Sequence, residues 1–116
     1  MIVAVIDDLI FRSRIHAAAE SAGAALTVLP STADAAALRD AAPSLVLVDL
    51  GAPAAIDRIR DLRALPGPPV TIVAFVSHVR ADLIVAAREA GADRVLARSA
   101  FVAELPALMR REPAAP

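Results

Sequence analysis

Three acidic side chains stand directly after apolar segments, and their type and spacing suit them to chemistry. Asp7 and Asp8 follow the apolar run at residues 2–6, and Asp49 follows the run at 45–48. Carboxylates brought together raise one another's pKa unless a cation neutralises them. Carboxylate oxygens suit Mg²⁺, and an aspartate beside a bound metal can act as the nucleophile toward a phosphoryl group. The three acids therefore predict a metal site with phosphoryl chemistry.

A hydroxyl and a cation stand in equivalent places after two later apolar segments. Ser77 follows the run at 70–76, and Arg98 follows the run at 94–97. Metal clamping, a hydroxyl donor and a fixed cation are the parts that phosphoryl transfer needs. Both side chains therefore fit the chemistry that the acids predict.

Structural roles are the alternatives for the same five residues. Asp7 and Asp8 could cap the first predicted helix and Ser77 the fourth, because Asp and Ser are favoured at helix N-termini. Arg98 could pair with Asp49 as a structural ion pair. In that case the charge pair would replace the metal.

Short apolar segments bounded by turn residues predict five β-strands buried on both faces. They are residues 2–6, 25–29, 45–48, 70–76 and 94–97. The segments between and after them are rich in Ala, Leu and Arg and have helical composition and length. They lie near residues 9–22, 32–41, 54–64, 81–90 and 101–111.

This alternation predicts right-handed crossovers and a doubly wound α/β fold, in which helices cover both faces of a five-stranded parallel sheet. Ligands of such folds bind beyond the carboxyl ends of the strands. We therefore expect the acids, the hydroxyl and the cation to gather at one edge of the sheet.

Local signals support the predicted helices. Gly23 and Gly91 stand where helices end, a position that glycine favours. Apolar side chains recur in the first helix at the spacing of one buried face. They are Phe11, Ile15, Ala18 and Ala22.

Some apolar side chains exceed what one helix face requires. Leu9 and Ile10, and residues 83–85, are predicted to belong to the core, and they would be docking sites if exposed. Of the two histidines, His16 is predicted to lie on a solvated helix face and His78 in a partly exposed loop.

The composition limits the class of protein. The chain has 116 residues and is 58% hydrophobic, which fits one compact domain and excludes disorder of the whole. Residues 1–111 are predicted to form that domain and residues 112–116 a disordered tail. The 12 basic side chains, all Arg, face 13 acidic ones, which leaves no basic field for nucleic acid or an anionic membrane.

The absence of cysteine excludes disulfides and thiolate zinc sites. The apolar start is too short for a signal peptide, so we expect a cytoplasmic protein. The nucleotide-binding patterns GxGxxG and GxxxxGK[ST] and the nucleophile pattern GxSxG are absent, which makes a small-molecule enzyme a weak alternative.

The order of these features resembles a response-regulator receiver domain of the chemotaxis type, over nearly the whole chain. The resemblance rests on Ile-Asp-Asp at 6–8, Leu-Val-Leu-Val-Asp-Leu at 45–50 with Pro53, Ser77, Gly-Ala-Asp at 91–93, Arg98 and Phe101. It implies a flavodoxin-like sheet with the strand order 2-1-3-4-5.

The resemblance also implies roles for the polar residues. Asp49 would accept a phosphoryl group from a histidine kinase or a phosphotransfer protein, while Asp7 or Asp8 would hold Mg²⁺ together with Asp49. Ser77 would be the switch hydroxyl, and Arg98 would stand for a lysine of the family. A separate output protein would read the surface of the fourth helix, strand five and the fifth helix, which could also form a homodimer. The chain would be a phosphoacceptor with self-dephosphorylation rather than a classical enzyme.

Several positions depart from the family pattern. Arg98 and Ser99 stand where the family has Lys and usually a cis-bonded Pro. Arginine presents a planar fork where lysine presents a point charge, and without proline we expect a trans peptide bond. His78 stands in the place of a small residue and Val95 in the place of a rotating aromatic.

The register of the acidic pair has two interpretations. Either both acids belong to the site, or a shift by one residue gives Asp7 the second acidic place and Ile6 the first, so that one metal carboxylate is missing. The alternative function is therefore a receiver-like interaction module that takes no phosphate, in which Arg98 replaces the metal and the lysine.

Overall fold

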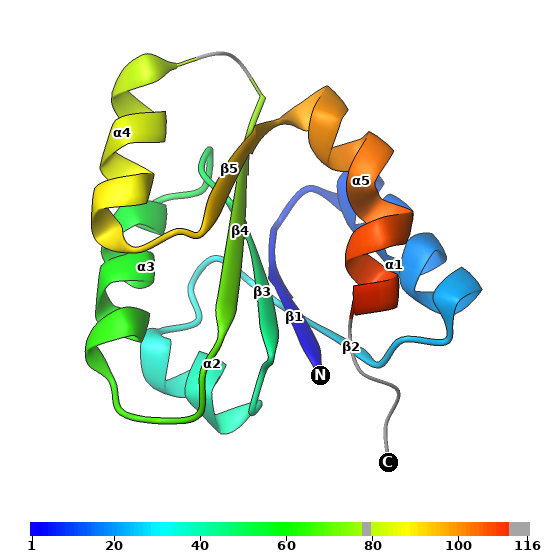
Figure 1. The fold of residues 1–116 in the computed structure, drawn as a ribbon, viewed down its shortest axis with the longest axis horizontal. Helices are drawn as coiled ribbons and strands as arrows, with labels where there is room; N and C mark the ends of the chain where they lie inside the picture. Colours follow the sequence, from blue (N-terminus) through cyan, green and yellow to red (C-terminus); the bar gives the residue numbers. More distant parts are fainter. Residues whose placement is uncertain (78–79, 112–116) are drawn as a thin grey trace.

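A computed structural model describes residues 1–77 and 80–111 of the chain, so the predictions for His78 and for the tail at 112–116 lie outside the described residues. Five parallel strands form one sheet in the order β2-β1-β3-β4-β5, as predicted (Figure 1). They are β1 (Ile2–Val5), β2 (Leu26–Leu29), β3 (Leu45–Asp49), β4 (Thr71–Val76) and β5 (Arg94–Ala97). Among the described helices, none is long and apolar enough to cross a membrane.

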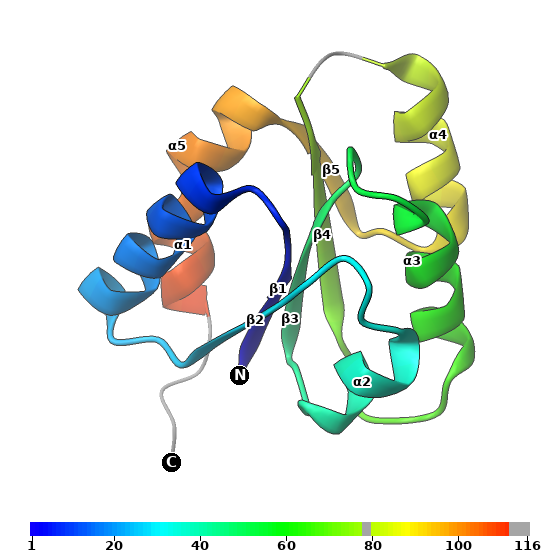
Figure 2. The ribbon, with the colours of Figure 1, turned by 180° about the vertical axis from the view of Figure 1, so that it is seen from behind.

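Helices cover both faces of the sheet, and Figures 1 and 2 show the division between them. The first and last helices lie on one face, and the other three lie on the opposite face. They are α1 (Leu9–Ala22), α2 (Ala35–Asp40), α3 (Ala55–Ala64), α4 (Ala81–Ala90) and α5 (Arg98–Arg111). The chain is therefore the doubly wound α/β fold that the alternation predicts.

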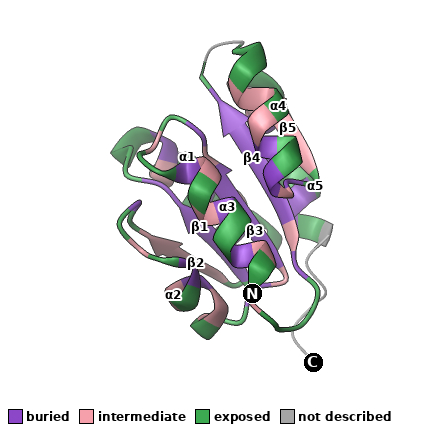
Figure 3. Cartoon of the chain, turned by 90° about the vertical axis from the view of Figure 1, so that its left-hand side faces the viewer, coloured by how far each residue is buried: buried purple, intermediate pink, exposed green. Residues whose placement is uncertain are grey.

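Alternation of side chains along the strands builds a separate core on each face. Along β1, Ile2 and Ala4 pack with α1 and α5, while Val3 and Val5 pack with α2, α3 and α4. All four are buried, and Figure 3 shows the same burial along the middle of the sheet. A residue's place in this alternation therefore decides which face its side chain joins.

The helix ends agree with the local signals. The backbone N–H of Phe11 donates to Asp8 Oδ1 at 3.0 Å, so Asp8 caps α1, which is one of the roles predicted for it. Gly23 and Gly91 end α1 and α4 with φ of 66° and 119°, the left-handed conformation that glycine favours. Ser77 does not cap α4, because the N-cap residue there is Arg80 and no side chain bonds to that helix end.

Two helix starts differ from the prediction. Asp34 accepts a hydrogen bond from the backbone N–H of Ala37 at 2.9 Å, so α2 begins after this cap rather than near residue 32. The last helix begins at Arg98 rather than at Phe101, because the chain passes from β5 into α5 without a loop. No described peptide bond is cis, as expected from the absence of proline at position 99.

The prediction that the surplus apolar side chains belong to the core is wrong for three of them. Leu9, Ile10 and Val85 are 72%, 75% and 53% exposed. In α1 the buried face is set by Phe11, Ile15 and Ala19, and the first two residues of the helix lie away from it. The other two surplus side chains, Leu83 and Ile84, pack partly against the core of α2, α3 and α4.

Two smaller predictions for α1 have different outcomes. The buried stripe contains Ala19 in place of the predicted Ala22, which is exposed, while Ala18 is half-buried. His16 is exposed, which confirms that it lies on the solvated side of the helix.

Candidate functional site

The strand register places an apolar side chain beside the end of β3. Val5 pairs with Val48, so the next residues along the two parallel strands are Ile6 and Asp49. Ile6 is 1% exposed and packs in the core beneath α1 and α5. The arrangement agrees with the shifted interpretation of the acidic pair, in which Ile6 takes the first place and Asp7 the second.

Asp7 is bound to the loop that follows β2. The backbone N–H of Ser31 donates to Asp7 Oδ1 at 2.9 Å, and the Ser31 hydroxyl donates to Asp7 Oδ2. The pKa of Asp7 is lowered, first by the bond from this hydroxyl, then by the bond from the Ser31 backbone, with smaller contributions from Arg12 and Arg58. Both carboxylate oxygens of Asp7 are therefore engaged on the side of β2.

Asp8 lies on the other side, at the start of α1. Its Oδ1 accepts the capping bond from Phe11, and its Oδ2 accepts a bond from Arg98 Nη2 at 3.1 Å. The backbone bond from Phe11 is the main cause that lowers the pKa of Asp8, and the bond from Arg98 is the second. This carboxylate thus has a helix cap on one oxygen and a cation on the other.

Arg98 reaches across the carboxyl edge of the sheet from the start of α5. Its Nη1 lies 3.5 Å from Ser77 Oγ, at the end of β4, and its Nη2 bonds Asp8, after β1. The guanidinium lies over the Phe11 ring, on the face of the sheet that α1 and α5 cover. Of the five residues predicted to meet at this edge, Arg98, Ser77 and Asp8 are in contact, whereas Asp7 and Asp49 have other partners.

Aromatic rings support the guanidinium. The Arg98 Cζ atom lies 4.3 Å from the centre of the Phe11 ring, a cation–π contact. Phe11 packs against Phe75 and Phe101, with ring centres 4.9 Å and 5.7 Å away. All three rings are buried, so the cation rests on a rigid apolar base.

Asp49 is the last residue of β3. Its Oδ1 accepts a hydrogen bond from the backbone N–H of Gly51 at 2.8 Å. Within residues 1–77 and 80–111, no cationic side chain lies within ion-pair distance of it. The structural alternative in which Arg98 pairs with Asp49 is therefore not what the structure shows, because Arg98 pairs with Asp8.

The described side chains do not fit a metal site of Asp7, Asp8 and Asp49. Among the described residues, no group of three or more acidic or histidine side chains is placed to hold a metal ion. Strand alternation explains the separation, because neighbouring residues after β1 leave the sheet toward opposite faces. Asp7 turns toward Ser31 while Asp8 turns toward Arg98.

A groove of about 680 Å³ opens beside Ser77 and Arg98, between the start of α1 and the start of α5. Ile10, Arg14 and Val102 form part of its wall. The exposed side chains of Leu9 and Ile10 stand at the start of α1 on this side. The hydroxyl and the cation of the candidate site are thus open to a molecule that approaches between α1 and α5.

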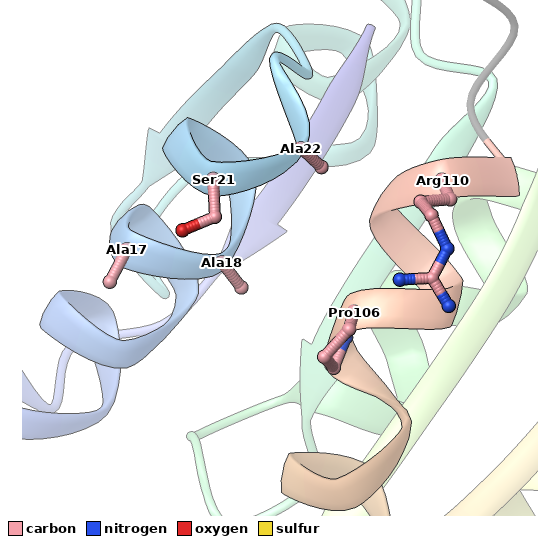
Figure 4. Close-up of a pocket in the computed structure, with 6 residues that line it drawn as sticks. All are labelled: Ala17, Ala18, Ser21, Ala22, Pro106 and Arg110. Atoms are coloured by element: carbon pink, nitrogen blue, oxygen red, sulfur yellow. The ribbon is translucent and has the colours of Figure 1, made fainter.

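A second hollow, of about 300 Å³, lies farther along the same two helices (Figure 4). Small side chains of α1 face Pro106 and Arg110 of α5 across it. None of the predicted site residues lines it, whereas Ser77 and Arg98 line the first groove. The α1 residues are Ala17, Ala18, Ser21 and Ala22.

Sequence reasoning missed two contributors to the site. No role is predicted for Ser31, although it bonds Asp7 and is 8% exposed. Phe11 was predicted only as core, although its ring also supports Arg98. The available signal was the strand order 2-1-3, which puts the loop after β2 beside the end of β1.

Comparison with known proteins gives a likeness in structure but none in sequence. No family model matches the chain, and no curated protein matches it. The receiver domain of NtrX from Brucella abortus is 20% identical with a TM-score of 0.76, and the match covers 96% of each chain. A CheY-like receiver domain protein from Methanospirillum hungatei is 17% identical with a TM-score of 0.75, over 96% of this chain and 90% of that one.

A third match is the Mn²⁺-bound form of the response regulator Rcp1, at 15% identity and a TM-score of 0.69, over 95% of this chain and 88% of that one. At such low identities the likeness establishes the fold alone. The fold of this chain is that of response-regulator receiver domains.

Proposed function

We propose that this chain is a single-domain receiver that accepts a phosphoryl group on Asp49 and signals by a change in its surface. The state of Asp49 carries the proposal. It ends a central strand at the edge where this fold binds ligands, and it has no cationic partner among the described residues, whereas Asp8 has one. A carboxylate with an unpaired charge is the better nucleophile of the two.

The transfer step uses groups that lie on the same edge. A carboxylate oxygen of Asp49 attacks the phosphorus of the donor, the bond from phosphorus to the donor breaks, and the donor keeps the electron pair. The product is an acyl phosphate on Asp49. Arg98 supplies positive charge and Ser77 a hydroxyl for the phosphoryl oxygens. No step is assigned to Mg²⁺, because Asp7 and Asp8 are both engaged elsewhere.

The donor would be a histidine kinase or a phosphotransfer protein that docks at the start of α1. Leu9 and Ile10 are exposed there, beside the groove that leads to Ser77 and Arg98. Apolar side chains exposed side by side are typical of a protein interface. A protein donor seated on them would bring its phosphoryl group to the open end of the groove.

The response would pass to a separate output protein through α4, β5 and α5. Ser77 directly follows β4, in the connection to α4, and its hydroxyl lies 3.5 Å from Arg98 at the start of α5. A phosphoryl group that draws Ser77 and Arg98 toward Asp49 would pull on both ends of this surface. The same surface would be the interface of a homodimer.

Binding of a phosphoryl mimic tests the proposal. Fluoroberyllate is added to the ¹⁵N-labelled protein in the presence of Mg²⁺, so that a missing metal cannot cause a negative result. In the wild-type protein we expect the backbone signals of Leu50, Gly51 and Ser77 to shift. In Asp49→Asn these signals should not shift. The control is Asp57→Asn, which changes an exposed acid of α3 and should respond as the wild type does. An unchanged wild-type spectrum, or equal shifts in Asp49→Asn, would overturn the proposal.

The bond between Arg98 and Asp8 favours a second candidate function. Because Arg98 already neutralises one acid, the domain could serve as a receiver-like interaction module that never takes phosphate and presents one fixed surface. The same titration separates the two candidates. Two conformations exchanged by the mimic would remove the interaction module.

A further inference from the structure

Two groups of the chain hold the two acids that follow β1, and they hold them apart. Ser31 contributes two hydrogen bonds to Asp7, one from its backbone and one from its hydroxyl. Arg98 contributes a charged hydrogen bond to Asp8. The partners of the two acids come from the two edge strands of the sheet, because Ser31 lies in the loop after β2 and Arg98 directly follows β5.

The contact with Ser31 satisfies Asp7 without a cation. Both carboxylate oxygens of the exposed Asp7 accept a hydrogen bond, and the donor Ser31 is buried. Hydrogen bonds to a charged group are stronger than those between neutral groups. Moving Asp7 toward Asp49 would break two of them and leave the buried Ser31 hydroxyl without its acceptor.

The contact with Arg98 places a positive charge directly beside Asp8. The guanidinium lies between Asp8 and Ser77, and the Phe11 ring beneath it keeps it in place. A cation added at this point would meet like charge at close range. It would also have to take Asp8 from Arg98.

We propose that this chain neutralises the acidic edge of its sheet from within, so that the wild-type protein takes up no divalent cation there. In this arrangement Ser31 is a positioning residue, because it acts by holding Asp7 on the side of β2. Arg98 acts as the built-in cation for Asp8. The inference rests on the proposed function, and it makes phosphorylation of Asp49 independent of a metal.

Mn²⁺ titration followed by the electron paramagnetic resonance of the free ion is the test. The variants are Ser31→Ala, which releases Asp7, and Arg98→Met, which removes the charge but keeps an apolar stem on the Phe11 ring. We expect no specific binding by the wild-type protein. The double variant should bind Mn²⁺ about tenfold more tightly than the wild-type protein, or more. Adding Asp8→Ala to the double variant should abolish this gain in affinity.

Matched controls separate this effect from a general change in surface charge. Thr32→Ala alters the exposed neighbour of Ser31, and Arg88→Ala removes an exposed arginine of α4. Both should behave as the wild-type protein does. Specific Mn²⁺ binding by the wild-type protein that Asp49→Asn weakens would overturn the inference, as would a double variant that folds, by its NMR spectrum, and binds no more than the wild type.

Labelling by acetyl phosphate in EDTA distinguishes failure of the inference from failure of the proposed function. Labelling of Asp49 that persists in EDTA supports both. Labelling that requires Mg²⁺ overturns the inference and leaves the proposed function standing. Absence of labelling with and without Mg²⁺, together with absence of Mn²⁺ binding, overturns the proposed function and leaves the self-neutralised edge standing.

Discussion

Two arginines at opposite ends of the sheet differ in how the protein holds them: Arg63 is bound through every nitrogen, whereas Arg98, for which we propose a role in phosphoryl chemistry, is not. At the amino end of β4, Arg63 uses all three guanidinium nitrogens. Nε bonds the carbonyl of Gly91 at 2.8 Å, Nη1 the carbonyl of Val70 at 2.7 Å, and Nη2 the carboxylate of Asp93 at 2.6 Å. The same carboxylate accepts the backbone N–H of Ile72 at 2.7 Å.

At the carboxyl end, Arg98 has fewer and longer contacts. Its bond to Asp8 is 3.1 Å long and its contact with Ser77 is 3.5 Å. A guanidinium has five donor hydrogens. Arg98 therefore keeps donors that a ligand could use, whereas all three nitrogens of Arg63 already donate to protein groups. The number and length of these bonds, rather than the residue type, distinguish Arg63 as a structural cation from Arg98, which we propose as the functional one.

Removing the structural cation should have the largest effect on stability. Arg63→Ala deletes three hydrogen bonds and leaves Asp93 without its cation. We expect the free energy of unfolding to fall by about 2 kcal/mol or more, measured by urea denaturation. If Arg63→Ala costs no more than a change at Arg98, the comparison between the two cations fails.

A methyl group at Gly91 should disturb the same structural contact. A Cβ there would lie 2.6 Å from Cγ of Arg63, and the φ of 119° disfavours other residues. We expect Gly91→Ala to cost about 1–3 kcal/mol, and Gly23→Ala to cost less, because a Cβ at Gly23 meets no atom within 4 Å. Equal losses in urea denaturation would show that backbone conformation alone, and not the fit around Arg63, governs both sites.

Removing the functional cation should have little effect on stability. Arg98→Met loses one exposed ion pair but keeps its contact with Phe11, so the free energy of unfolding should change by less than about 1 kcal/mol. The same variant should lose most of its response to fluoroberyllate. A strongly destabilised variant would place Arg98 with Arg63 among the structural cations.

Low pH should reduce the stability of the folded chain through Asp7 and Asp8. The pKa of each is lowered in the folded chain by hydrogen bonds. Their contribution to stability is therefore complete above the unfolded-state pKa of about 4 and is lost as the pH falls through the lower folded-state pKa. Between about pH 5 and pH 2, the midpoint temperature of thermal unfolding should fall less in the double variant Asp7→Asn/Asp8→Asn than in the wild-type protein. Equal falls of the midpoint temperature in the two proteins would contradict this.

The sequence predicts the fold and the neighbourhood of the site better than it predicts the partners within the site. Strand periodicity and the strand-helix alternation are local signals, and they identify the elements that carry Asp49, Ser77 and Arg98. The partner of Arg98 depends on how the start of α5 packs against the start of α1, which no local pattern encodes. Asp8 rather than Asp49 receives it.

The two faces of the sheet explain two further differences between the sequence predictions and the structure. Asp7 and Asp8 are adjacent in sequence, yet alternation sends one toward Ser31 and the other toward α1. Leu9 and Ile10 have core-like chemistry, but the rotation of α1 is set by Phe11, whose ring fills the space beneath α5. Both outcomes depend on packing between elements distant in sequence.

Intact-mass spectrometry after incubation with acetyl phosphate tests the central claim, that Asp49 is the phosphoacceptor, most directly. We expect one added phosphoryl group on the wild-type protein, removed by hydroxylamine as expected for an acyl phosphate, and none on Asp49→Asn. A wild-type protein whose mass stays unchanged at every donor concentration, or an adduct that persists in Asp49→Asn, would contradict it.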